Sequence, residues 1–238
     1  MKKFAFLLSL LVSFGALAQN RTKEYHISVG PFDKIIVENN INVVFSTKKD
    51  SIGYINYTCT PDLADAVIAS CKDGKLKIQL EADYTLRKDL PTVYVYSNYL
   101  TYVNNSSDST FTAREIPENF RFEVKQVGNG TINVPNVVCT EAIVRLSTGK
   151  GNINISGKCE SAKIFMIGTG VIQADLLQAN SVECKILGGG AIGCDPRNAL
   201  TVKGIGSTKI YYRSEPPVIK KTGGGKLIPL SNSSSERL

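Results

Sequence analysis

Two acidic side chains recur at the same point of a repeated phrase. Asp175 and Asp195 each follow the first glycine of a Gly-x-Gly phrase, Gly168 or Gly188, by seven residues. If the two phrases stack, the carboxylates lie one above the other and could share a cation or a proton. They are therefore candidate metal ligands for weak Ca²⁺ binding. Because aspartate is also ordinary at the turn after a strand, no metal site is assigned.

The same pair could serve a polysaccharide lyase or hydrolase, which needs two acids and a base or metal. The equivalent positions of other repeats hold no base, and His26 is the only histidine. Histidine-dependent triad chemistry would have to use His26, which is expected to be exposed on an entry strand. We therefore assign no catalytic residue and no cofactor. The equivalent positions are Pro135, Ser156 and Tyr211.

A literal G-x-G-x-x-G match runs from Gly188 to Gly193. A dinucleotide fingerprint also needs a helix that begins there and receives the pyrophosphate. The residues that follow, Cys194-Asp-Pro-Arg-Asn, predict a turn instead. No cofactor-binding residue is assigned.

The six cysteines would suit disulfides in an oxidising compartment. Cys59 and Cys71 flank a predicted helix and are the favoured pair. Cys139 and Cys159 could face each other on adjacent repeats, although straight stacking is awkward for a disulfide. Cys184 and Cys194 are expected to be small core residues.

The elements that carry these residues repeat about every 20 positions. Each repeat reads Gly-x-Gly, a small or polar residue, an aliphatic, a polar residue and another aliphatic. Alternation predicts strands, and a period of this length is typical of a solenoid. The first glycines are Gly128, Gly149, Gly168, Gly188, Gly204 and Gly223.

Stacking the repeats predicts two inward ladders and one outward row of amides. The fold predicted is all-β, a right-handed parallel β-helix with glycines at its corners. A β-sandwich with glycine-rich turns is the alternative. The first ladder is Ile132, Ile153, Ile172, Ile192, Thr208 and Leu227; the second is Val134, Ile155, Ala174, Cys194 and Ile210; the amides are Asn133, Asn154 and Gln173.

The chain divides into four predicted segments: a signal peptide at 1–18, a β-rich part at 19–100, the repeat β-helix at 101–230, and a polar tail at 231–238. One short helix is predicted at 61–71, with Pro61 at its start and acidic residues in its first turn. Ser107-Asp-Ser109 fits the repeat with serines in place of glycines.

The net charge is +7, and +5 once Lys2 and Lys3 leave with the signal peptide. Lys220, Lys221 and Lys226 form the densest basic cluster, either for an anionic partner or as a solvated cap on the last repeat. No basic helix with interleaved aromatics supports nucleic-acid binding. No second long apolar run follows the signal peptide, so no membrane span is expected.

The phrases Gly128-Asn-Gly-Thr-Ile-Asn133 and Gly149-Lys-Gly-Asn-Ile-Asn154, with the opening Gly30-Pro-Phe-Asp-Lys-Ile-Ile-Val37, resemble one bacterial family. This is the autotransporter-adhesin head domain family with the GIN repeat. The resemblance implies a pectin-lyase-like β-helix in an exported protein of Bacteroidetes-type bacteria. It implies no enzymatic activity and offers no catalytic residues.

The function expected is non-enzymatic, adhesin-like binding of a polysaccharide or of an envelope or host protein. A structural or assembly role in the cell envelope, with an oligomer formed through open edges, is the first alternative. An enzyme that uses Asp175 and Asp195 is the second. The expected location is the periplasm or the cell surface. Candidate aromatic platforms are Tyr94, Tyr96, Tyr99 and Tyr102.

Overall fold

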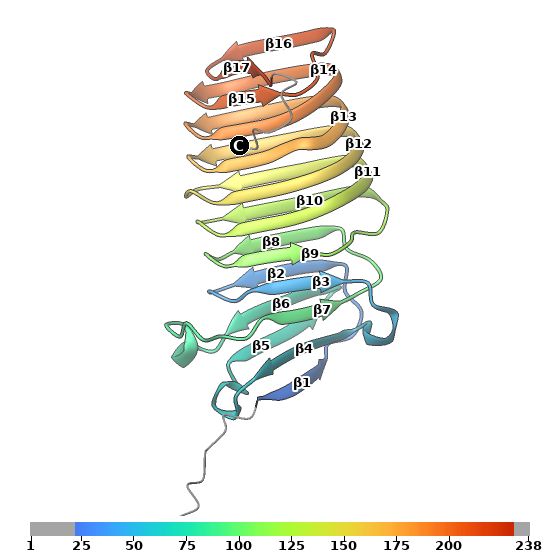
Figure 1. Ribbon diagram of the computed structural model, residues 1–238, viewed down its shortest axis with the longest axis vertical. Helices are drawn as coiled ribbons and strands as arrows, with labels where there is room; N and C mark the ends of the chain where they lie inside the picture. Colours follow the sequence, from blue (N-terminus) through green and yellow to red (C-terminus); the bar gives the residue numbers. More distant parts are fainter. Residues whose placement is uncertain (1–21, 231–238) are drawn as a thin grey trace, which may run out of the picture.

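The protein is a β-solenoid of about six turns, with parallel bridges about 20 residues apart. The computed structural model describes residues 22–230. Its 17 strands form one continuous sheet that winds up the long axis (Figure 1). The predicted all-β parallel β-helix is therefore confirmed. The predicted signal peptide (1–18) and polar tail (231–238) lie outside the described residues.

Four long strands form the regular part of the solenoid. They stack in parallel, and each bends so that it contributes to both flat faces of the coil. The bends coincide with register shifts, and Gly-x-Gly corners connect one strand to the next. These strands are β11 (Thr131–Ser147), β12 (Asn152–Gly168), β13 (Val171–Gly188) and β14 (Ala191–Gly206).

The apolar ladder predicted from the repeats is confirmed with one correction. Ile132, Ile153, Ile172 and Ile192 are register partners and are fully buried. The next member is Ile210, not Thr208, because Gly206 rather than Gly204 aligns with Gly188. Ile210 therefore leaves the second predicted ladder, where Tyr212 is the partner of Cys194. Thr208 is instead a buried corner residue whose hydroxyl donates to the Gly188 carbonyl at 3.0 Å.

The last rungs are formed by short strands. β15 (Lys209–Tyr212) and β17 (Lys226–Pro229) continue one face, and β16 (Val218–Gly223) continues the other. In the described part of the chain, β16 pairs only with β14, and β17 only with β15. One edge of each is therefore open at this end of the stack.

Parallel stacking also continues below β11. The rungs there pair out of sequence order, so that β2 lies between β6 and β8, and β3 lies between β7 and β9. The strands are β2 (Lys34–Glu38), β3 (Val43–Ser46), β6 (Lys75–Leu80), β7 (Val93–Tyr96), β8 (Tyr102–Ser106), β9 (Thr110–Ala113) and β10 (Asn119–Val127). Parallel pairing thus crosses residue 100, where the sequence suggested a boundary.

The helix predicted at 61–71 is wrong. Pro61–Leu63 is a single 3-10 turn, η2, and Val67–Lys72 is strand β5. β5 pairs antiparallel with β6 through Asp73 and Gly74, which both have positive φ. An Asp-Gly turn between alternating apolar residues is a strong hairpin signal, and it prevails over the helical start signals.

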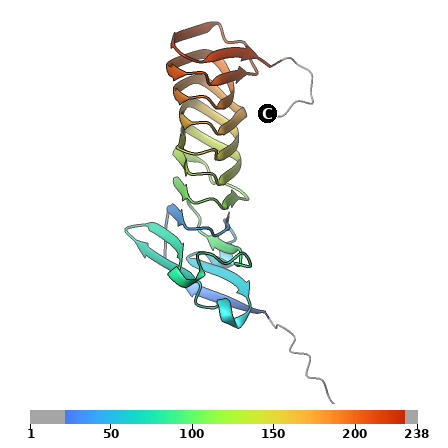
Figure 2. The same cartoon turned by 90° about the vertical axis from the view of Figure 1, so that its left-hand side faces the viewer.

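The remaining N-terminal elements close the bottom of the stack. β1 (Lys23–Ser28) and β4 (Tyr54–Cys59) pair antiparallel, and β4 also pairs antiparallel with β7. Figure 2 shows the N-terminal strands, in blue to teal, at the end of the stack opposite the last rungs. Two further 3-10 turns lie here, η1 (Lys49–Ser51) and η3 (Ala82–Tyr84). No helix in the described residues is long and apolar enough to cross a membrane.

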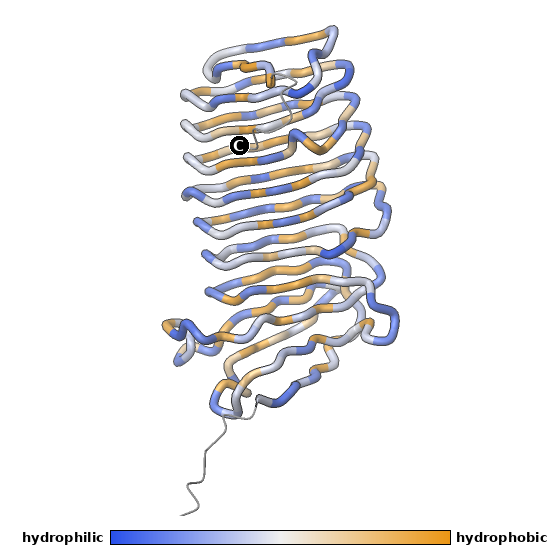
Figure 3. The backbone as a smooth tube through the Cα atoms, viewed as in Figure 1, coloured by the Kyte–Doolittle hydropathy of each residue, from blue (hydrophilic) through white to orange (hydrophobic). Residues whose placement is uncertain are grey.

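The core is one continuous apolar column with a polar insert. Along each rung, hydrophobic and hydrophilic residues alternate (Figure 3), and the apolar ones face inward. Near the first repeat, Asn105 and Gln126 are fully buried and hydrogen-bonded to each other at 2.8 Å. Ser107 and Ser109 complete this network, and Ser109 donates to the Ile41 carbonyl at 2.6 Å.

Candidate functional site

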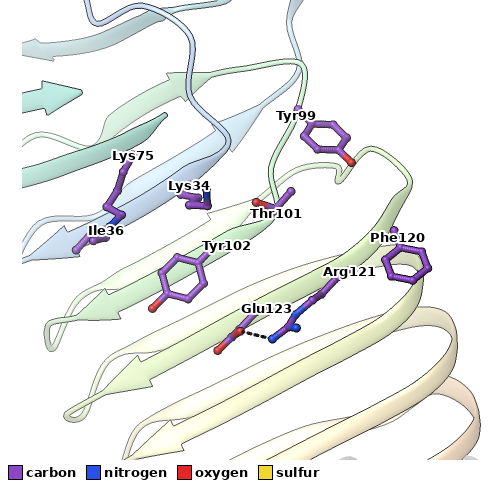
Figure 4. Close-up of a pocket in the computed structure, with 9 residues that line it drawn as sticks. All are labelled: Lys34, Ile36, Lys75, Tyr99, Thr101, Tyr102, Phe120, Arg121 and Glu123. Carbon is purple, nitrogen blue, oxygen red and sulfur yellow. Dashed lines mark hydrogen bonds and ion pairs between the residues drawn. The ribbon is translucent and has the colours of Figure 1, made fainter. Parts of the chain in front are cut away.

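A hollow lies where the N-terminal rungs meet the regular solenoid. It is an open groove of about 540 Å³ on the outer face of the sheet (Figure 4). Strands β2, β6, β8 and β10 and the segment before β8 supply its side chains. The lining residues are Lys34, Ile36, Lys75, Tyr99, Thr101, Tyr102, Phe120, Arg121 and Glu123.

The floor of the groove is a row across four parallel strands. Lys75, Lys34, Tyr102 and Glu123 are successive register partners. Neighbouring strands lie about 4.8 Å apart, so the row spans roughly 14 Å. Strand alternation directs all four side chains outward, since Leu76, Ile35, Val103 and Val124, one residue further on, are fully buried.

The charge of the groove is mainly positive. Its one acid, Glu123, is held by Arg145 at 2.8 Å and approached by Arg121 at 3.4 Å. Lys34 lies 3.6 Å from Asp33, an exposed contact that is weak in water. No carboxylate of the described chain lies within ion-pair distance of Lys75. Arg121 also lies 3.6 Å from Glu141. An anionic ligand would therefore meet Lys75, which has no carboxylate partner in the described chain, and two cations, Lys34 and Arg121, whose ion pairs are exposed and weak.

The aromatic side chains of the groove are accessible. Tyr99 is 45% exposed and Phe120 is 76% exposed, and the two stand near the same end of the hollow (Figure 4). Burial, and then the charge of Glu123, raises the pKa of the Tyr102 phenol. Tyr102 therefore keeps its hydroxyl proton at neutral pH and can donate a hydrogen bond.

The four tyrosines proposed as platforms separate into two places. Tyr99 and Tyr102 line the groove, as described. Tyr94 and Tyr96 line a smaller hollow of about 220 Å³ on the other flat face. There the guanidinium of Arg114 sits 5.6 Å from the Tyr94 ring centroid. The sequence identified the aromatics but not the cations that accompany them.

Asp175 and Asp195 do not stack as expected. β14 shifts register after Cys194, so Asp195 partners Gln178. Asp175 binds Arg213 at 2.5 Å, and the buried Asp195 binds Arg197 at 3.1 Å. The sequence missed Arg213, which is 38 residues from Asp175. No group of three or more His, Cys, Asp or Glu residues suited to a metal occurs in residues 22–230.

Because each carboxylate already has an arginine partner, Ca²⁺ would have to displace two ion pairs. We expect isothermal calorimetry with Ca²⁺ at about millimolar concentration to give a flat titration. A saturable heat that disappears in Asp175→Asn would contradict this and restore a cation site at the pair.

The other predicted residues have ordinary places. Cys184 and Cys194 are buried, as expected, and Cys139 faces Cys159 on the next rung. All six cysteines are free, so the predicted Cys59–Cys71 disulfide is wrong. The cause is the missing helix, because Cys71 lies on β5 and points to the Pro31 carbonyl, 3.5 Å away. His26 is exposed on β1.

Residues 31–216 match the family model of the "Putative auto-transporter adhesin, head GIN domain". The chain belongs to this family. No curated protein matches the sequence. The Gly-x-Gly corners from Gly128 to Gly206 and the inward isoleucine ladder described above lie within these matched residues.

Solved structures share the GIN head fold. A putative adhesin from Bacteroides fragilis NCTC 9343 has a TM-score of 0.78 and 19% identity, over 88% of this chain and 97% of that chain. A putative lipid binding protein from Parabacteroides distasonis ATCC 8503 has a TM-score of 0.62 and 20% identity, over 90% of this chain and 98% of that chain. A putative adhesin from Parabacteroides merdae ATCC 43184 has a TM-score of 0.61 and 21% identity, over 90% of this chain and 98% of that chain. At these identities the likeness shows the fold alone.

Proposed function

We propose that the protein is an exported, non-enzymatic, adhesin-like binding protein whose groove takes an acidic glycan. The observation that carries this proposal is the combination of exposed aromatics with incompletely neutralised cations in one hollow. The adhesin names of the family and of similar structures support binding rather than catalysis. An envelope or host protein is the alternative ligand, and the location is the periplasm or cell surface.

Each part of the groove has a role in this proposal. The ring of Phe120 offers an apolar face for the C–H groups of a sugar, with Tyr99 beside it. Lys75, Lys34 and Arg121 attract the carboxylate or sulfate of an acidic residue. Tyr102 donates a hydrogen bond to a ring or hydroxyl oxygen. The open form of the hollow suits a residue within a polymer as well as a chain end.

A structural or assembly role in the envelope is the second candidate. Its support is the open edge of β16 and β17, where backbone groups lack a further strand. Such an edge can pair with another chain. This role would leave the groove without a sugar ligand.

Binding to the groove is testable by replacing Phe120. We expect the wild-type protein to retain acidic oligosaccharides, such as oligouronates, on a glycan array, and Phe120→Ala to lower the affinity about fivefold. Lys75→Gln should weaken the binding of acidic glycans and leave the binding of neutral glycans unchanged. Leu86→Ala is the matched control, because Leu86 is 93% exposed and lies outside the groove.

Two results would count against the glycan groove. One is an array without binding, accompanied by a pull-down that recovers a protein partner. The other is glycan binding that Phe120→Ala and Lys75→Gln leave intact, which would move the site elsewhere. Circular dichroism of each variant confirms the fold, and little change is expected because both side chains are at the surface.

A further inference from the structure

The charge of the protein is concentrated at the C-terminal end of the solenoid. Residues 191–229 contain seven Lys and Arg and two Asp and Glu, a net charge of +5. Residues 22–190 contain 17 basic and 18 acidic side chains, a net charge of −1. The last rungs thus carry the positive charge of the described chain, and the groove lies several rungs away from them (Figure 1).

The acids near this end form no ion pair with its last three lysines, and the exposed Glu215 before β16 has none with them either. Asp195 is 1% exposed and is paired with Arg197. Glu183 is shared by Lys185 and Lys203, at 3.6 and 3.5 Å. No carboxylate of the described chain pairs with Lys220, Lys221 or Lys226. These three lysines are therefore available to an anion outside the molecule.

The last rung also leaves the core uncovered. Every residue of β16 is exposed. Ile219 is in register with the buried Leu200 and Lys221 with the buried Val202, so both occupy core positions at an open end. Lys221 turns its ammonium to the Gly223 carbonyl at 2.7 Å. A further rung packed on this column would bury the charge of Lys221, which costs free energy.

Aliphatic side chains stand among these lysines. Leu187 and Ile205 are register partners on the outer face and are 55% and 74% exposed. Val218 and Ile219 on the last rung are 44% and 40% exposed. The corner beside Ile205 is Gly223-Gly-Gly225, which adds no side-chain bulk. We define the terminal surface as Leu187, Ile205, Val218, Ile219, Lys203, Lys220, Lys221 and Lys226.

We propose that the terminal surface docks on a membrane surface that carries anionic lipid headgroups. Lysines attract phosphate-bearing lipids, and exposed aliphatic side chains enter the boundary between headgroups and acyl chains. A second copy of the chain would bring the same lysines together, so charge repulsion opposes self-association through this end. Docking by this surface stands the solenoid on its C-terminal end.

The test is co-flotation of the purified protein with vesicles. We expect binding to phosphatidylcholine vesicles that contain phosphatidylglycerol, little binding to phosphatidylcholine alone, and weaker binding as salt is raised. Each lysine near an anionic surface changes partitioning about fivefold, so Lys220→Gln with Lys221→Gln should lower it about 25-fold. Ile205→Ser should lower it further without changing charge.

The matched control is Lys48→Gln with Lys49→Gln. These exposed lysines lie between β3 and β4 in the N-terminal part, so the double variant makes the same change in net charge away from the terminal surface. Equal weakening by the two double variants would overturn the proposal, because it would show a general charge effect. Absence of binding to anionic vesicles would overturn it as well. Phe120→Ala separates this surface from the groove, since it should leave vesicle binding unchanged.

Discussion

Gly188→Ala is expected to stop the solenoid from folding cooperatively. A Cβ at this position would lie 2.0 Å from the Gly168 carbonyl oxygen of the rung below. The φ of Gly188 is 152°, a backbone conformation that is strained for any other residue. The clash is with backbone, so a rotamer change cannot relieve it. Moving the two rungs apart would break the backbone hydrogen bonds between β12 and β13 and disturb the pairing of β13 with β14. We expect a loss of several kcal/mol, a large part of a typical stability.

Gly30→Ala is the control for backbone conformation alone. Gly30 has φ of 75°, and a Cβ there would meet nothing within 4 Å. Its cost is expected to be about 1 kcal/mol. Urea denaturation followed by circular dichroism measures both variants. If Gly188→Ala lost no more stability than Gly30→Ala, close rung contact would not be what requires glycine at the corner.

The second large effect is expected at the buried amide network. Gln126 accepts from Asn105 at 2.8 Å and donates to the Ser107 and Val127 carbonyls at 3.0 Å each. Gln126→Leu keeps similar volume and removes all three hydrogen bonds. Because the orphaned groups are buried, we expect a cost of about 3 kcal/mol.

Asn154→Ala provides the comparison for that variant. Asn154 donates to the Asn133 side chain at 2.7 Å on the outer face, where water can replace the bond. Its loss is expected to cost less than about 1 kcal/mol. Chemical denaturation of both variants tests the difference. Equal losses would mean that burial of the network does not determine its contribution.

Much of the fold could be predicted because the repeat carries its own register. Each Gly-x-Gly corner fixes where the following isoleucine falls, and this placed Ile132, Ile153, Ile172 and Ile192 in one column. The rule failed at Gly204-Ile-Gly206, where two glycines compete for the corner and the structure uses the second. The same irregularity of rung length moved Asp195 away from Asp175.

Features made by contacts distant in sequence could not be predicted. The groove joins Lys34, Lys75 and Arg121, which become neighbours only because β2 and β6 pair out of sequence order. Asn105 and Gln126 lie 21 residues apart and meet inside the coil, where the repeat pattern suggests apolar residues. The helix at 61–71 was wrong because the pairing of β5 with β6 is decided across a turn and not within the segment.

The stacking of rungs also makes the length of the protein adjustable. From Glu123 in the groove to Lys220 on the last rung, the register passes through Ile143, Lys163, Glu183 and Thr201. These five steps span roughly 24 Å. Because each rung contacts only its neighbours, gain or loss of one repeat would change this distance by roughly 4.8 Å and leave both ends intact. Duplication of a repeat would thus lengthen the distance between the groove and the last rung by one fixed increment.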